Sequence, residues 1–178
     1  MSDFKHKIDF GSARFLRLPL VIKKNFLKLE NFRKETNMPA INHPDNRSTI
    51  ALLIINNREF WGANKATAGI TDKMKDDLKA LLKDENSRSA HSVVLTHAEV
   101  DAIVAAHYKN MNADSAEMYV DRKLCGFCAG KDFNAGSLRR LLPLLSLQIL
   151  KVYTPDENGN ITEVTLKTDR TFVSHIFL

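Results

Sequence analysis

Two short motifs carry the side chains of this chain that are best suited to chemistry. His97 and Glu99 are separated by one residue, and the only two cysteines, Cys125 and Cys128, are separated by two. One imidazole and two thiolates suit zinc, and three protein ligands leave a fourth tetrahedral position open for water. Zinc lowers the pKa of such a water to about 7. The motifs therefore predict a catalytic zinc site held by His97, Cys125 and Cys128, with Glu99 left free to transfer protons.

Each motif has a simpler interpretation when it is taken alone. Thr96 and Glu99 have the spacing of a helix capping box, with Thr96 at the N-cap and Glu99 at the third helical position. A Cys-x-x-Cys pair is also typical of thioredoxin-like redox proteins, and the two cysteines could be ordinary buried thiols. The two motifs together favour zinc, because both are expected where a strand or loop leads into a helix. A helix N-terminus is positive and stabilises an anionic cluster.

The pattern His97-x-Glu99 with Cys125-x-x-Cys128 resembles the zinc-dependent cytidine deaminase superfamily. In that superfamily one histidine and two cysteines hold the metal, and the glutamate is a general acid and base rather than a ligand. The resemblance implies that Glu99 carries protons during conversion of cytosine to uracil. Leu124 is a departure, because most members have proline before the first cysteine. The change removes no ligand and bears on fine specificity only.

The resemblance also implies contacts with the substrate. Asn64 follows a predicted strand at a point where deaminases often carry an asparagine that contacts the sugar or base; a turn asparagine is the other interpretation. His91 lies in a polar loop from which it could meet a flanking nucleotide, and Phe127 could line the base pocket or belong to the core. Ala98, between the histidine and the glutamate, completes the predicted contacts. Trp61 is expected in the core, with stacking on a base as the alternative.

The expected secondary structure supplies a frame for these motifs. An apolar, β-branched run, an Asn56-Asn57 turn and a return strand predict a buried hairpin. Strands are expected over residues 49–55, 58–63, 116–121, 147–153 and 161–167, with an edge strand over 171–177. Helices are expected over residues 71–83, 96–109 and 137–142, with Pro143 disturbing the last.

This order of elements is that of the cytidine deaminase fold, an α/β fold with three layers (α/β/α) around a mixed five-stranded sheet. The link over residues 156–160 is too short for a crossover, so the last two main strands are expected to be antiparallel. That arrangement, with the Cys-Gly-Phe-Cys motif, most resembles the deaminase domains at the C-termini of bacterial polymorphic toxins. We expect residues 1–40 to form a basic N-terminal segment with a first helix, and residues 41–178 to form the deaminase domain.

Composition sets further bounds. A chain of 178 residues with 44% hydrophobic and 26% charged residues suits a globular protein with one core. The apolar stretch over residues 15–29 contains four basic residues and no signal-peptide cleavage site. Two cysteines at metal spacing favour a reducing environment. Residues 1–35 hold nine basic and four acidic residues, an excess that attracts phosphate or simply solvates an amphipathic helix.

The favoured function is zinc-dependent deamination of cytosine in nucleic acid, with DNA preferred and the base single-stranded or flipped. By resemblance the protein is a monomeric interbacterial toxin, secreted or injected, which acts in the target-cell cytoplasm. Its expected partners are nucleic acid and an acidic immunity protein that covers Asn64, the 86–92 loop and Cys125; no membrane partner is expected. A deaminase of free cytidine is the enzymatic alternative. A non-enzymatic zinc or redox module is the other, and there Glu99 would serve only as a cap.

Overall fold

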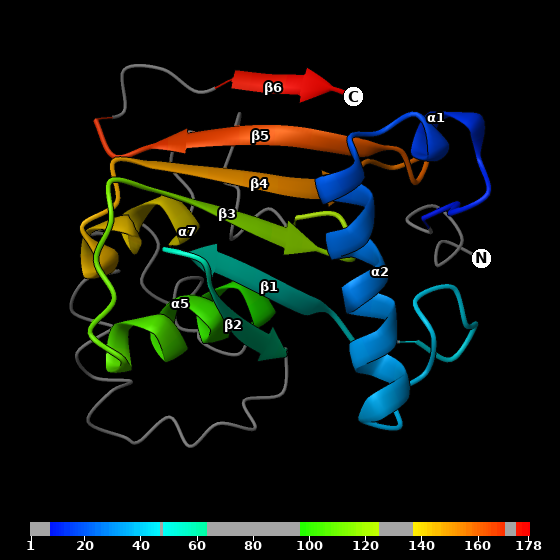
Figure 1. The fold of residues 1–178 in the computed structure, drawn as a ribbon, viewed down its shortest axis with the longest axis horizontal. Coiled ribbons are helices and arrows are strands. Elements are labelled where there is room, and N and C mark those ends of the chain that lie inside the picture. The colour runs from blue at the N-terminus through cyan, green and yellow to red at the C-terminus, as the bar shows by residue number, and fades with distance from the viewer. Residues whose placement is uncertain (1–7, 47, 64–96, 125–136, 170–173) are drawn as a thin grey trace, which may run out of the picture.

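A six-stranded sheet with helices on both faces forms the described part of the chain (Figure 1). The structure is a computed structural model that describes residues 8–46, 48–63, 97–124, 137–169 and 174–178. The helices are α1 (Ala13–Leu16), α2 (Leu20–Glu35), α5 (Ala98–Tyr108), α7 (Ser137–Arg140) and the 3-10 helix η3 (Leu142–Leu145). The strands are β1 (Ile50–Ile55), β2 (Arg58–Ala63), β3 (Ser115–Val120), β4 (Ile149–Pro155), β5 (Ile161–Lys167) and β6 (Ser174–Phe177).

The sheet confirms the predicted fold class. Its strand order is β2-β1-β3-β4-β5-β6, with β3 and β4 parallel and every other neighbouring pair antiparallel. β6 is the expected edge strand beside the five main ones. The β4–β5 turn is tight because one oxygen of the Asp156 carboxylate accepts the backbone N–H groups of Asn158 and Asn160, at 2.8 and 3.0 Å. The predicted helix over residues 71–83 lies outside the described residues.

The β1–β2 hairpin closes through a two-residue turn. Asn56 and Asn57 have φ angles of 50° and 62°. Both therefore adopt the left-handed conformation that a type I′ turn requires. Asparagine tolerates this conformation better than most residues. Because the turn fixes the register, Gly62 lies opposite Ala51, and β2 forms one edge of the sheet.

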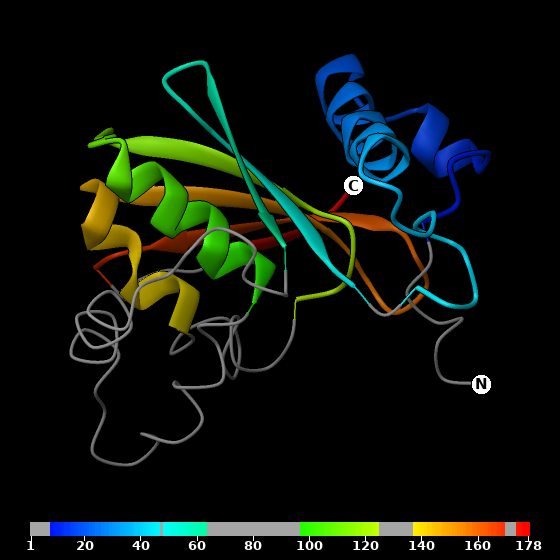
Figure 2. The same ribbon diagram turned by 90° about the horizontal axis from the view of Figure 1, so that it is seen from below.

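Helices α2 and α5 cover opposite faces of the sheet (Figures 1 and 2). Side chains alternate along a strand, and β1 follows this rule. Ala51 and Leu53 pack in the core beneath α5, whereas Ile50 and Leu52 pack in the core beneath α2. The predicted three-layer arrangement is therefore confirmed for the part of the chain that the structure describes.

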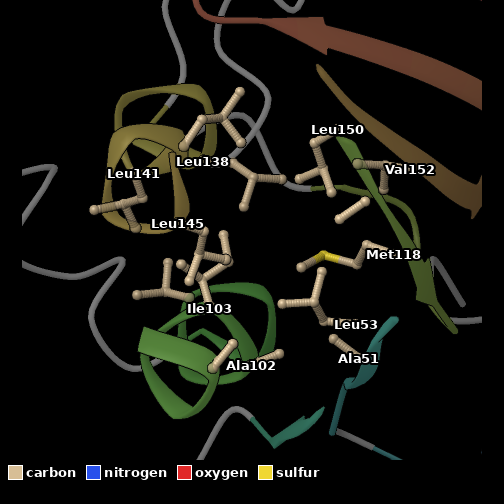
Figure 3. Close-up of a cluster of buried hydrophobic side chains, with 14 of the residues drawn as sticks. Ala51, Leu53, Ala102, Ile103, Met118, Leu138, Leu141, Leu145, Leu150 and Val152 are labelled. Carbon is tan, nitrogen blue, oxygen red and sulfur yellow. The ribbon is translucent and has the colours of Figure 1, made fainter. Parts of the chain in front are cut away.

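The core on the α5 side includes α7 and η3 as well as α5 (Figure 3). Ile103 of α5 packs among Leu53, Met118, Leu138 and Leu145 from surrounding strands and helices. Every residue over 98–104 is buried. A helix enclosed on all sides must also bury any polar side chain that its sequence contains. This enclosure places two carboxylates of α5 in the interior.

The core on the α2 side is rich in aromatic side chains. Phe26 meets Tyr119 edge to face with ring centroids 5.7 Å apart. Trp61 stacks on Phe32 with centroids 4.4 Å apart and ring planes 7° from parallel. Trp61 therefore faces α2, which agrees with the expected core position and not with base stacking beside α5. Among the described residues, no helix is both long and apolar enough to cross a membrane.

Candidate active site

His97 is the N-cap of α5, and Glu99 is the second residue of the helix. A capping box with Thr96 at the N-cap, the alternative interpretation of this motif, does not fit this start, because the helix begins one residue later than a Thr96 cap requires. The His97 backbone is extended, with φ −86° and ψ 146°, as is usual at an N-cap, and its side chain makes no capping hydrogen bond. The His97-x-Glu99 motif therefore straddles the junction between loop and helix, and a capping box does not account for it.

Burial separates Glu99 from an ordinary first-turn glutamate. Its exposed fraction is 4%, and that of His97 is intermediate. A glutamate that only complements the positive end of a helix can do so from the surface, where its charge stays hydrated. Burial of a carboxylate costs free energy unless polar partners surround it. The chain therefore holds an acid–base group inside the protein, next to a histidine at the border with solvent.

Gly62 brings the start of α5 unusually close to β2. A Cβ atom at position 62 would lie 2.0 Å from the carbonyl oxygen of Ala98 and 2.6 Å from the backbone nitrogen of Ala102. No side chain fits at those distances, so only glycine permits this approach. The glycine thus sets the distance between the helix that carries Glu99 and the end of β2.

Asp101 joins the same two elements by a hydrogen bond. Its Oδ2 accepts the backbone N–H of Ala63 at 3.0 Å, and its own N–H donates to the His97 carbonyl oxygen at 3.0 Å. Burial raises the pKa of Asp101, and the bond from Ala63 opposes that rise. Sequence reasoning missed this residue. The available signal was a second acid in the first turn of an otherwise apolar helix.

The segment that leads from β3 to Cys125 packs on the same side of the sheet as α5. Leu124, the residue before Cys125, has an exposed fraction of 5% and packs in the core cluster that also contains Ala98. Its large apolar side chain occupies the position at which the superfamily usually has proline. The first turn of α5 and the residue before Cys125 therefore belong to one hydrophobic core.

Of the remaining predicted site residues, the structure describes only Ala98. Ala98 is completely buried beside Gly62. The predicted ligands Cys125 and Cys128 and the predicted contacts Asn64, His91 and Phe127 lie outside the described residues. Within the described ranges, no group of three or more His, Cys, Asp or Glu side chains could hold a metal ion. Because only one of the three predicted ligands falls within these ranges, the zinc site stays a prediction.

Two other features lie away from Glu99. His107, on the last turn of α5, is exposed and its Nδ1 lies 3.1 Å from the Leu144 carbonyl oxygen. The basic helix α2 lies across the sheet from α5 (Figure 2). Lysines and arginines of α2 therefore do not line the surroundings of Glu99, and any phosphate that they attract binds on the other face.

The fold and the buried glutamate at the start of α5 define a protein of the cytidine deaminase class. A family model described as MafB19-like deaminase matches residues 26–170, and the chain belongs to this family. The match includes both motifs and all five main strands. Comparisons with curated proteins and with solved structures returned no match.

Proposed function

We propose that this deaminase uses zinc to hydrolyse cytosine to uracil in nucleic acid, with DNA as the favoured polymer. The observation that carries the proposal is the Glu99 carboxylate, which is 4% exposed and lies two residues from a half-buried histidine at the N-cap of α5. Membership of a deaminase family supports the reaction type. The resemblance to the cytidine deaminase superfamily supports the choice of base.

The donor set of the two motifs fits zinc. His97, Cys125 and Cys128 would hold the ion, and zinc with three protein ligands would supply Lewis acidity that lowers the pKa of water. The position of His97 supports this role, because its side chain is half-buried at the start of a helix, at the border with solvent. The positive end of α5 favours a negatively charged cluster at that point.

Glu99 moves the protons in the proposed reaction. It accepts one proton from the attacking water and delivers that proton to N3 of cytosine. The water oxygen forms a bond to C4, the bond between C4 and the exocyclic nitrogen breaks, and Glu99 passes the second proton to the departing amine. The products are uracil and ammonia. A buried carboxylate suits this work because bulk water does not compete for the transferred protons.

The base must be reachable for this chemistry. C4 of cytosine is inaccessible inside a stacked duplex, so the substrate is single-stranded or carries a flipped base. The polymer approaches on the α5 face, since Glu99 is carried by that helix and α2 occupies the other face. Contacts from Asn64, His91 and Phe127 remain part of the proposal.

A biological role as an interbacterial toxin belongs to the same proposal. It is supported by the antiparallel β4–β5 hairpin and by the Cys-Gly-Phe-Cys motif, which resemble toxin deaminases. Such a protein would be secreted or injected, would act in the cytoplasm of a target cell, and would be blocked in the producer by an acidic immunity protein. The wild-type gene can be expressed without its neighbouring genes in a host that lacks uracil repair. A harmless outcome would contradict the toxin role.

Sequencing after expression tests the substrate directly. The wild-type gene and a Glu99→Gln control are expressed in cells that lack uracil repair, and genomic DNA and RNA are sequenced. We expect C-to-T changes in DNA with wild type only. In parallel, purified protein is incubated with single-stranded DNA, duplex DNA, RNA and free cytidine while ammonia is measured. Release from free cytidine alone would replace the proposal with a nucleoside deaminase, and release from none would contradict an enzyme of cytosine.

A further inference from the structure

A fully buried ion pair joins α2 to the end of β3. Nε of Arg33 donates to Oδ2 of Asp121 at 2.8 Å, and both side chains have an exposed fraction of 0%. Arg33 lies on the face of the sheet opposite to α5, whereas Asp121 is the first residue after β3. The pair therefore connects the far layer of the protein with the segment that leads to Cys125.

Each of the three nitrogen atoms of the Arg33 guanidinium has at least one hydrogen-bond acceptor. Nη1 of Arg33 donates to the Pro39 carbonyl oxygen, to Asn46 Oδ1 and to Ser48 Oγ, at 3.0, 2.9 and 3.0 Å, and Nη2 donates to the Ser48 carbonyl oxygen at 2.9 Å. The guanidinium thus also fixes the loop that precedes β1. A lysine has no planar fork with which to reach all these acceptors.

The Asp121 carboxylate is held on both oxygens. Oδ1 accepts the backbone N–H of Ile50 at 3.0 Å, while Oδ2 accepts from Arg33. The Asp121 backbone N–H in turn donates to the Ile50 carbonyl oxygen at 3.2 Å. Burial raises the pKa of Asp121, and the Arg33 guanidinium and the Ile50 N–H partly oppose that rise.

Stability alone does not require such a pair. Buried ion pairs can often be replaced by packed apolar side chains at little or no cost, since removing two charges from water is expensive. The α2 face is already packed through Phe26 and Leu29, both with an exposed fraction of 0%. The ion pair instead fixes the direction in which the chain leaves the end of β3.

The three residues between Asp121 and Cys125 are also anchored. The carbonyl oxygen of Arg122 accepts the Thr154 hydroxyl at 2.8 Å, Lys123 forms an exposed ion pair with Glu157 at 2.7 Å, and Leu124 is buried in the α5-side core. The surface pair contributes little. The buried residues Asp121 and Leu124, with the part-buried bond at Arg122 between them, fix this segment on both faces of the sheet.

We propose that Arg33 and Asp121 are positioning residues that set where the chain leaves β3 for the zinc-binding cysteines. This inference rests on the proposed function, because it takes Cys125 and Cys128 as the ligands. Residues that hydrogen-bond directly to metal ligands typically change metal affinity about 10–100-fold when they are altered; Arg33 and Asp121 act through the chain, so we expect the lower end of that range. The consequence is that α2, on the face away from Glu99, contributes to the metal site.

The test compares Arg33→Lys with Leu29→Ala. Both changes alter a fully buried side chain of α2, but only the first disturbs the pair. Zinc-loaded proteins are mixed with excess chelator at a temperature at which both variants are folded, and the rate of zinc release is measured. Hydrogen exchange of the amides at residues 121–124 is followed in the same samples. We expect Arg33→Lys to release zinc about 10-fold faster than Leu29→Ala and to exchange faster at 121–124.

Equal zinc release from the two variants, with equal exchange at 121–124, would overturn the inference and leave a structural pair only. A wild-type protein that binds no zinc would contradict the proposed function instead. If Arg33→Lys fails to fold, the double variant Arg33→Met with Asp121→Leu keeps the test available, because apolar replacement of both partners often preserves stability. It should fold and still release zinc faster than Leu29→Ala; release at the control rate would overturn the inference.

Discussion

Asp101 of α5 accepts the backbone N–H of Ala63 at 3.0 Å, and this bond joins α5 to the last residue of β2. The two residues are 38 positions apart in the chain. Asn64, the predicted substrate contact, follows Ala63 directly. A single buried carboxylate thus connects the helix that carries Glu99, the proposed proton-transfer residue, with the strand that leads to the predicted substrate contact.

Replacing Asp101 should therefore affect both stability and activity. Asp101→Ala removes the acceptor of the part-buried Ala63 N–H, and the loss of such a hydrogen bond costs about 0.5–1.5 kcal/mol of unfolding free energy. Asp101→Asn keeps an acceptor and should lose less. Asp114 is an exposed acid. Surface changes of this kind, such as Asp114→Ala, usually alter stability by no more than about 0.5 kcal/mol. Urea unfolding of the three variants checks the order; equal stability of Asp101→Ala and wild type would show that the bond contributes nothing.

Gly62→Ala should be more damaging than its size suggests. The new Cβ would lie 2.0 Å from the Ala98 carbonyl oxygen, so α5 must move away from β2. Overpacking of this kind costs about 1–3 kcal/mol, and the displacement carries Glu99 with it. We expect a lower unfolding free energy together with reduced deamination.

Gly11→Ala is the matched control for that change. A Cβ at position 11 would lie 3.5 Å from Asp9 Oδ1, which is an ordinary contact. Its unfolding free energy and activity should stay near those of wild type. If Gly62→Ala behaves like Gly11→Ala in both measurements, α5 and β2 are not as closely packed as the structure places them.

Removal of the metal should lower both activity and stability. Chelation, or Cys125→Ala, takes away zinc whose binding energy is partly folding energy. We expect about one zinc per chain in the wild type by elemental analysis, a lower melting temperature in the chelated protein, and recovery of both properties when zinc is returned. A disulfide between Cys125 and Cys128 in freshly reduced protein, with no bound metal, would favour the redox alternative.

Local patterns predicted much of the fold. The strands at residues 58–63 and 161–167 have the predicted bounds, and the antiparallel pairing of β4 and β5 is confirmed. Each depends on neighbours in the chain: an Asn-Asn turn, a short polar link, or alternating side chains. The alternative interpretation as a capping box differs from the structure by one residue, because α5 begins at Ala98 with His97 as its N-cap.

Long-range contacts could not be predicted in the same way. Arg33 and Asp121 are 88 positions apart, and nothing in their local sequence indicates that either is buried. Arg33 looked like one more basic residue of a solvated helix. Asp101 has an ordinary place for an acid, in the first turn of a helix. In both cases burial is imposed by the layers on either side of the sheet, which no single segment encodes. The zinc ligands Cys125 and Cys128 stay predictions that rest on motif spacing and resemblance.

The most direct measurement of the central claim is the activity of Glu99→Gln. Glutamine keeps the size of the side chain but cannot carry the transferred proton, and it removes the favourable charge at the helix start. Deamination of a cytosine-containing single strand should fall by about 10²–10⁴ or more, while zinc content and fold stay those of wild type. A zinc-loaded, folded Glu99→Gln protein that converts cytosine at the wild-type rate would contradict the account.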